Sequence, residues 1–442
     1  MQMYYDGVKR MDKIVERAKK YLITSMVSKF QPIVVSSASG TIVKDVLGKE
    51  YIDCFAGISV VNAGHCHPEV VNAAIEQARR LVHACSYVYY VPPTIDLAEK
   101  LAQITPVQLQ KSFFGNSGAE AIECAIKLAR KYTKKYELIA LMCSFHGRTI
   151  GTLSVTGQAE RRRFDMGPYL TGVSFTYPPY CYRCPFEKEY PACDLICART
   201  INHVINYCTG KGVAAFIAEP IMGEGGIIVP PPEYFKIIKE VLDDHDILFI
   251  ADEVQSGFGR TGKFFAIEHY GVEPQLMALA KGIANGFPIS ACITRADIGD
   301  SFEPGDHLST FGGNPVSAAA ALANIQILLR EKLSEKAAEK GEYIMKRLNQ
   351  MKEDYSIIGD IRGRGLMIGI ELVKDREKKT PAKNETMKVR ERARKEGLLI
   401  GSGGVEGCVL RIQPPLVIEK KQIDEMLSIL EMAIKEVQLD LR

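Results

Sequence analysis

The chain has 442 residues, of which 46% are hydrophobic and 25% are charged, and its formal net charge is +3. This size allows a large buried core and at least two domains, and the small net charge argues against nucleic acid or a membrane surface as a partner. No apolar run is long enough to cross a bilayer, and the first seven residues lack the pattern of a secretory leader, so we expect a cytoplasmic protein.

The first predicted element is a β-hairpin over residues 42–53, with its turn at Gly48. It precedes the long alternating part of the chain. We expect this hairpin to pair with strands near the C-terminus, which would make the smaller domain discontinuous in sequence.

The middle of the chain alternates short apolar runs with helical patterns. The runs lack the polar alternation of half-exposed strands, which indicates strands buried on both faces. They lie at 111–114, 138–142, 214–218, 247–251 and 276–280. Residues 119–131 have apolar positions at helical spacing. This order predicts an α/β fold in which a parallel sheet is covered by helices on both faces.

A smaller α+β unit follows the small-residue helix predicted at 317–329. Residues 332–351 predict a charged amphipathic helix, and residues 365–372 and 409–412 predict strands. The expected organisation is therefore an N-terminal segment at 1–64 that joins the small domain, a large domain at 65–326, and a small C-terminal domain at 327–442.

Four cysteines are concentrated in one tyrosine- and proline-rich segment. Cys181, Cys184, Cys193 and Cys197 follow the spacing C-x2-C-x8-C-x3-C. Four thiolates could close a zinc or iron–sulfur site, which would suit a non-catalytic, metal-binding scaffold protein. Local disulfides and free thiols are the alternatives, and the short inner spacing favours them over a metal.

Lys281 follows the apolar run at 276–280, and burial there would favour its neutral amine, which can form a Schiff base with an aldehyde. Other strand ends carry residues suited to the same chemistry. The glycine turn at 115–121 runs into a helix and could bind a phosphate, and Asp252 could pair with a protonated ring nitrogen. Ligands bind at such strand ends in open parallel sheets.

A second enzyme class is suggested by the G-x-G-x-x-G pattern at 257–262, which is typical of dinucleotide-binding dehydrogenases. The pattern stands alone. No long helix follows it directly, and the acids Asp252 and Glu253 precede the glycines instead of following them. We therefore favour the lysine chemistry.

Several motifs, in order along nearly the whole chain, resemble those of class III pyridoxal-phosphate aminotransferases. They are YID at 51–53, NAGHCHP at 62–68, NSGAEA at 116–121, FHGRT at 145–149, EPIMGEGG at 219–226, DEVQSGFGRTG at 252–262, KG at 281–282, TFGGNP at 310–315 and RIQPPL at 411–416. The resemblance implies the fold of type I pyridoxal-phosphate enzymes, with a mainly parallel seven-stranded sheet, and a homodimer with its active sites at the interface.

The resemblance also implies pyridoxal 5'-phosphate as the cofactor and assigns roles to residues. Lys281 would bind the cofactor covalently and shuttle a proton, and Asp252 would keep the cofactor ring protonated. Thr310 would come from the partner subunit. The remaining cofactor positions would be Ser117, Gly118, Ala119, Phe145, His146, Glu219 and Gln255.

Substrate choice follows from the same resemblance. Glu224 and Arg411 match a switchable pair of the 4-aminobutyrate branch, and Ile58 and Arg148 match positions that line its substrate pocket. This implies transfer of the terminal amine of an ω-amino acid to a 2-oxo acid such as 2-oxoglutarate. The stretch QPPLVI at 413–418 also resembles the amino-acid racemases and epimerases of this fold, which are the alternative.

Overall fold

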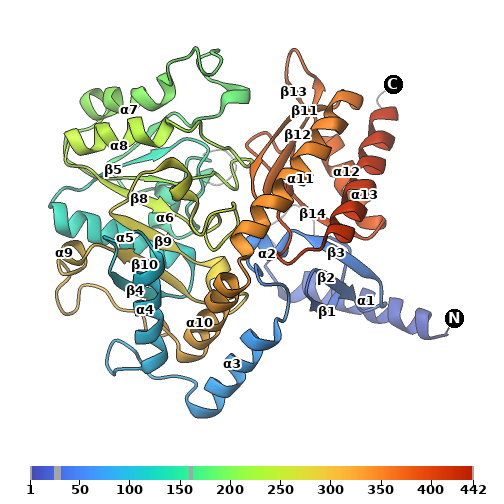
Figure 1. Cartoon of the computed structure of the whole chain (residues 1–442), viewed down its shortest axis with the longest axis horizontal. Coiled ribbons are helices and arrows are strands. Elements are labelled where there is room, and N and C mark those ends of the chain that lie inside the picture. The colour runs from blue at the N-terminus through green and yellow to red at the C-terminus, as the bar shows by residue number, and fades with distance from the viewer. Residues whose placement is uncertain (1, 24–30, 159–162, 441–442) are drawn as a thin grey trace.

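The computed structural model describes residues 2–23, 31–158 and 163–440, and it contains two β-sheets with helices packed around them (Figure 1). The larger sheet has seven strands in the order β4-β10-β9-β8-β7-β5-β6. Its strands are β4 (Lys111–Gly115), β5 (Glu137–Leu141), β6 (Val173–Thr176), β7 (Val213–Ala218), β8 (Leu248–Asp252), β9 (Leu276–Leu279) and β10 (Ser290–Thr294).

This sheet confirms the predicted fold class and all five predicted strands, within one or two residues at each end. Two strands, β6 and β10, were not predicted. All neighbours pair in parallel except β10, which runs antiparallel to both β4 and β9. The connection from β9 to β10 contains only a 3-10 turn at Lys281–Ile283, so it has no crossover helix that could return the chain for parallel pairing.

Helices cover both faces of the sheet. On one face α5 (Gly118–Thr133) packs on the strands, and its buried side chains include Ile122, Ala125 and Leu128. On the other face lie α7 (Ile196–Tyr207) and α8 (Tyr234–Asp244). Alternate strand residues enter the two hydrophobic clusters; in β5, Leu138 and Ala140 face one cluster while Ile139 and Leu141 face the other.

The second sheet joins the two ends of the chain. Its order is β1-β2-β3-β14-β15-β12-β11, with β13 paired to β12. The strands are β1 (Val35–Ser39), β2 (Ile42–Asp45), β3 (Glu50–Cys54), β11 (Ile358–Arg364), β12 (Met367–Asp375), β13 (Thr380–Pro381), β14 (Leu398–Gly403) and β15 (Val409–Ile412). The predicted hairpin forms as β2 and β3, and β3 pairs in parallel with β14. The exact domain boundaries stay a prediction.

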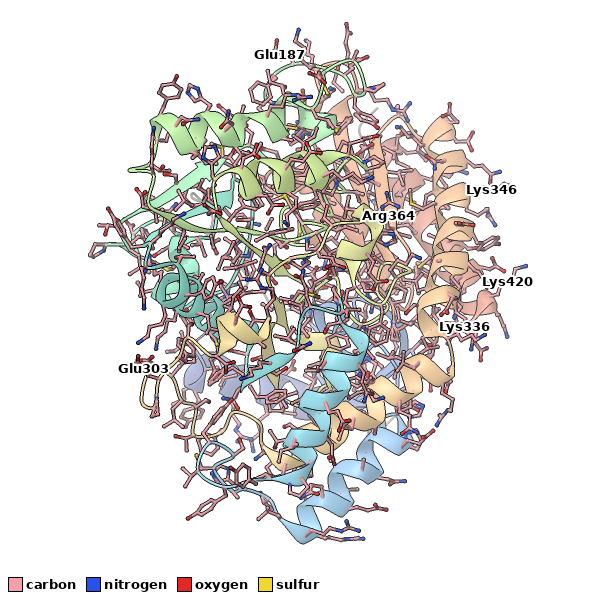
Figure 2. All side chains as sticks on the ribbon, turned by 60° about the vertical axis from the view of Figure 1, so that its left-hand side comes forward. Glu187, Glu303, Lys336, Lys346, Arg364 and Lys420 are labelled. Carbon is pink, nitrogen blue, oxygen red and sulfur yellow. The ribbon has the colours of Figure 1, made fainter. Side chains whose placement is uncertain are left out.

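Further helices pack beside the larger sheet, around the second sheet and between the two units. In Figure 2, Lys336, Lys346 and Lys420 mark the outer face of the unit built on the second sheet. These helices are α1 (Gln2–Tyr21), α3 (Pro68–Arg80), α4 (Pro92–Ile104), α6 (Ile150–Ser154), α9 (Ala296–Gly299), α10 (Pro315–Arg330), α11 (Leu333–Asp354), α12 (Lys383–Lys395) and α13 (Lys420–Leu439). Within the described residues, none of the helices has the length and apolar character needed to cross a membrane.

The short element α2 (Ala56–Ser59) has an unusual backbone. All four of its residues have a positive φ, which reaches 71° at Ile58, so it is a left-handed turn. A β-branched residue rarely adopts this conformation. Asp53 stabilises the start of the turn, because its Oδ1 accepts hydrogen bonds from the amides of Phe55 at 2.9 Å and Ala56 at 3.0 Å.

Candidate active site

A cavity of about 140 Å³ lies where the parallel strands of the larger sheet end. Each lining residue lies at or after the end of one of the strands β4, β5, β7, β8 and β9. The lining residues are Gly118, Ala119, Phe145, His146, Gly147, Glu219, Asp252, Val254, Gln255 and Lys281. The fold therefore gathers all the predicted cofactor residues in one cavity except Ser117 and Thr310.

Lys281 begins the 3-10 turn directly after β9, with a positive φ of 45°. Burial lowers the pKa of Lys281 below its usual value, although the carboxylates of Glu224 and Asp252 act in the opposite direction. Because the shift is downward, a larger fraction of Lys281 is the neutral amine than at an exposed site. A neutral amine is the form that attacks an aldehyde.

Asp252 ends β8 and is buried at the bottom of the cavity. Its Oδ2 lies 2.7 Å from Nδ1 of His146, and its Oδ1 accepts a hydrogen bond from the amide of Val254 at 3.0 Å. His146 is also buried, and its second ring nitrogen, Nε2, has no hydrogen-bond partner among the residues that the structure describes. The pair thus places a fixed carboxylate and an unsatisfied nitrogen in the cavity wall.

Glu219 follows β7 and its carboxylate is anchored at both oxygens. Oε1 accepts from the amide of Phe145 at 2.9 Å, and Oε2 accepts from the amide of Gly223 at 2.8 Å. Burial raises the pKa of Glu219 to about 7, and the nearby Asp252 adds to this effect while His146 opposes it. Burial therefore favours the protonated form of Glu219 more than an exposed carboxyl would.

The first turn of α5 closes one end of the cavity. Gly118 packs closely there, because a Cβ added to it would lie 2.8 Å from Cγ1 of Val254. Ser117 is the N-cap residue: its Oγ accepts from the amide of Glu120 at 3.3 Å and donates to the Glu120 carboxylate at 3.0 Å. Ser117 is exposed and does not line the cavity, so it caps the helix instead.

Glu224 and Arg411 form a largely buried ion pair close to Lys281. Arg411 Nη1 donates to Glu224 Oε1 at 2.5 Å, and both residues influence the pKa of Lys281. Arg411 belongs to β15, so the pair joins the second sheet to the loop after β7. The guanidinium carbon of Arg411 also lies 5.5 Å from the ring centroid of Phe55.

Besides Ser117, Glu224 and Arg411, three further predicted residues lie outside the cavity lining. Ile58 is half-buried in the left-handed turn. Arg148 is exposed, and its guanidinium carbon lies 5.3 Å from the ring centroid of Phe145. Thr310 is exposed. The single chain therefore does not bring Arg148 or Thr310 into the cavity.

Four residues near the site were not predicted: Gly147, which lines the cavity, and three others. Val254 lines the cavity, Phe55 lies against Arg411, and Gln413 Nε2 donates to Gln255 Oε1 at 3.0 Å. Val254 and Gln413 belong to the motifs at 252–262 and 411–416, and their place in these motifs was the available signal. Phe55 directly follows the end of β3, and an aromatic residue at a strand end was the available signal.

The four-cysteine segment encloses a separate cavity of only about 10 Å³, lined by all four cysteines. The four thiols are free. Among the described residues, no group of three or more histidine, cysteine, aspartate or glutamate side chains is arranged to hold a metal ion. The metal-binding scaffold alternative therefore gains no support from the structure.

Comparison with known proteins identifies the family of the chain. Residues 24–434 match the family model described as aminotransferase class III. The chain is 45% identical over 430 residues to a leucine/methionine racemase from Thermococcus litoralis, covering 97% of this chain and 96% of the relative. It is 42% identical over 426 residues to an acetylornithine aminotransferase from Methanothermobacter thermautotrophicus, covering 96% and 99% of the two chains.

A solved structure gives the same result for the fold. An amine transaminase from an uncultivated Pseudomonas species, solved in its PLP-bound form, superposes with a TM-score of 0.88 at 31% identity, covering 94% of this chain and 98% of that one. Together with the family match, this excludes the dehydrogenase interpretation of residues 257–262. The chain belongs to the class III aminotransferase family, and it is an enzyme of that family with pyridoxal 5'-phosphate as its cofactor.

Proposed function

We propose that the protein transfers the terminal amine of an ω-amino acid of the 4-aminobutyrate type to a 2-oxo acid, with 2-oxoglutarate as the acceptor. The observation that supports this most is the ion pair between Glu224 and Arg411 near Lys281. A transaminase must accept two substrates in turn. The ω-amino acid has no carboxylate next to its amine, whereas glutamate has one. The positive charge that Arg411 presents to the substrate must therefore be adjustable.

The residues of the cavity suit the cofactor. Asp252 offers a buried carboxylate to the ring nitrogen, Phe145 offers an aromatic face to the ring, and the first turn of α5 at Gly118 and Ala119 offers backbone amides to the phosphate. Bound there, pyridoxal phosphate supplies an aldehyde that exchanges with amines and a ring that withdraws electrons from the substrate carbon.

Lys281 and the ion pair carry out the protein's part of the reaction. Lys281 would hold the cofactor through Nζ. Once the substrate amine has displaced it, the freed amine of Lys281 would take the proton from the substrate carbon and return it. With an ω-amine, Glu224 neutralises Arg411. With glutamate or 2-oxoglutarate, Glu224 releases Arg411, whose guanidinium then binds the carboxylate next to the reacting carbon.

Amino-acid racemisation is a second candidate function, because the chain is 45% identical to a leucine/methionine racemase. The exposed position of Arg148 weakens its role as a cation for a distal carboxylate, which would have favoured 4-aminobutyrate. The ion pair favours transamination nevertheless. A racemase meets a carboxylate on the reacting carbon in every cycle, so it has no need to neutralise Arg411.

We also propose that the active enzyme is a homodimer. Thr310 lies beside an exposed apolar surface, and large exposed apolar surfaces in soluble proteins mark interaction sites. Phe311 is 62% exposed and Tyr90 is 96% exposed. Val82 and Tyr89, which precede Tyr90, and Leu308, which precedes Phe311, are also exposed apolar residues. A second copy of the chain would cover this surface and bring its own Thr310 to the phosphate.

The test compares products from the purified holoenzyme. Incubation with 4-aminobutyrate and 2-oxoglutarate should form glutamate over many turnovers, and 4-aminobutyrate alone should give no more than one turnover. Lys281→Ala should abolish the reaction and the borohydride-sensitive visible absorbance of the bound cofactor. If L-leucine or L-methionine in heavy water instead yields the deuterated D-isomer without an oxo acid, and no glutamate forms, the protein is a racemase.

A further inference from the structure

Glu224 lies in the glycine-rich turn 223–226, and its position depends on how that turn is held. The turn packs against residue 404 of the second sheet: the amide of Gly404 donates to the carbonyl of Glu224 at 3.3 Å. A Cβ added to Gly226 would lie only 3.1 Å from Cα of Gly404. Gly226 also has a φ of 118°, which favours glycine, so the turn has little room to adjust by itself.

Arg362 of β11 also contacts this turn. Its Nη2 donates to the carbonyl of Gly226 at 2.7 Å, and its Nε lies 3.0 Å from the same oxygen and 3.1 Å from the carbonyl oxygen of Ile227. The planar guanidinium thus makes a forked contact with two neighbouring carbonyls. A lysine could not reproduce it, because an ammonium is a single point of charge.

Glu371 of β12 keeps Arg362 in this orientation. Glu371 has no exposed side-chain surface, and its Oε2 lies 2.8 Å from Arg362 Nη1. Arg183 Nε donates to Glu371 Oε1 at 2.5 Å, and the hydroxyl of Tyr180 donates to Oε2. Burial alone would raise the pKa of Glu371, but these partners outweigh it and the pKa lies below its usual value, so the carboxylate is charged.

Tyr180 and Arg183 come from the four-cysteine segment, residues 177–197, whose outer end is marked by Glu187 at the top of Figure 2. The hydroxyl of Tyr180 also accepts from Arg362 Nη2 at 3.1 Å, and the Arg362 guanidinium lies 4.9 Å from the Tyr180 ring centroid. The segment is therefore docked on the same charge cluster that contacts the turn carrying Glu224.

We propose that Arg362, oriented by Glu371 and Tyr180, is a positioning residue that holds the turn 223–226 and so determines how readily Glu224 pairs with Arg411. The four-cysteine segment then influences substrate choice indirectly, because it helps to hold the cluster of Arg362, Glu371 and Tyr180 in place. The proposal deepens the proposed function and rests on it. Arg362 does not line the cavity that would hold the cofactor, so its influence on the reaction would pass through Glu224.

The experiment measures the two half-reactions of the holoenzyme separately, with 4-aminobutyrate and with glutamate. In Arg362→Lys, we expect the KM for 4-aminobutyrate to rise about tenfold while the KM for glutamate changes less than about twofold, because only the first substrate needs the closed ion pair. Tyr180→Phe should also raise the ratio of the KM for 4-aminobutyrate to the KM for glutamate, but by a smaller factor. The absorbance of the bound cofactor should not change in either variant.

The matched control is Arg376→Lys. Arg376 also donates to backbone carbonyls at the second sheet, at Ile358 and Tyr355, but it does not contact the turn. In Arg376→Lys, the ratio of the KM for 4-aminobutyrate to the KM for glutamate should equal that of the wild type. An equal loss in both half-reactions of Arg362→Lys would mean a merely structural role and would overturn the proposal.

A double-mutant cycle gives the decisive result. In a Glu224→Ala background, Arg362→Lys should no longer alter the substrate ratio, since the residue through which it acts is absent. Additive effects would overturn the proposal. If the wild type does not react with 4-aminobutyrate, the proposed function fails, and the cycle is then measured with the α-amino acid that the enzyme does accept. A coupling of about fivefold or more between Arg362 and Glu224 would still support the positioning role of Arg362, and additive effects would overturn it.

Discussion

Arg411 and Glu224 stand 187 positions apart in the chain, and yet the Arg411 guanidinium donates to the Glu224 carboxylate at 2.5 Å. Arg411 is only 3% exposed. A nearly buried cation that loses its partner is costly, so this pair is sensitive to any change of either residue or of the substrate beside it.

Removal of Glu224 should therefore change substrate preference. In Glu224→Ala, Arg411 is left without its counter-charge unless the substrate supplies a carboxylate. We expect the KM for 4-aminobutyrate to rise about tenfold or more, equivalent to about 1.4 kcal/mol, while glutamate binds as well as before or better. Half-reaction kinetics measure both. Glu406→Ala, at an exposed position in the neighbouring loop, is the control, and an equal loss for both substrates would contradict the prediction.

Gly118→Ala should weaken cofactor binding. The new Cβ would lie 2.8 Å from Cγ1 of Val254, so the first turn of α5 or the Val254 side chain must move. We expect the affinity for pyridoxal phosphate to fall about tenfold, since a small displacement misaligns the backbone amides. Titration of the apoprotein, followed by absorbance, gives the dissociation constant. Val254→Ala added to Gly118→Ala removes the clash and should restore most of the affinity; no loss in the single variant would refute the argument.

Glu253→Gln should stabilise the protein at alkaline pH. Burial raises the pKa of Glu253 to about 7, whereas the unfolded carboxyl ionises near 4.5. Between these values the unfolded chain binds fewer protons than the folded chain, so stability falls as the pH rises through this window. The loss of folding stability caused by ionising the buried Glu253 carboxyl is about 3 kcal/mol; it is fully present well above pH 7 and absent below pH 4.5.

A glutamine retains the Glu253 contacts, because its oxygen can accept from the amide of Ile267 and its amide can donate to Ser256, where the carboxylate now accepts. Thermal unfolding of the variant and the wild type at pH 5 and pH 8 measures the effect. The advantage of Glu253→Gln should be large at pH 8 and small at pH 5. The exposed control Glu377→Gln should show no such dependence, and a pH-independent difference would be inconsistent with the linkage.

Arg260→Lys should destabilise the fold. Arg260 is fully buried, and its guanidinium donates to the carbonyls of Leu366 and Pro414 and, at 2.6 Å, to Asn62 Oδ1. It therefore joins the N-terminal segment and the second sheet to the loop after β8. One ammonium cannot reach all three acceptors, and we expect a loss of about 3 kcal/mol.

Denaturant unfolding measures the effect of Arg260→Lys, with Arg330→Lys as the control. Arg330 is 48% exposed and pairs with Glu69, so its replacement should shift the unfolding midpoint much less than Arg260→Lys does. Equal midpoints for the two variants would show that the buried contacts of Arg260 contribute little.

The sequence by itself determined the central architecture and most of the cavity. Strands such as β8 and β9 are continuous apolar runs, and burial on both faces leaves this pattern in the sequence whatever their neighbours are. Lys281 and Asp252 could be recognised for the same reason, because each directly follows such a run, and parallel strands end at one edge of the sheet.

The tertiary structure alone decided the contacts between distant segments. The antiparallel β10, the left-handed turn at Ile58 and the cluster of Arg362, Glu371 and Tyr180 leave no local pattern, because each depends on which segment packs beside it. The ion pair of Glu224 and Arg411 was anticipated from the family resemblance, but its burial beside Phe55 was not. Such side-chain pairs form only when the two sheets come together, and local sequence does not record that approach.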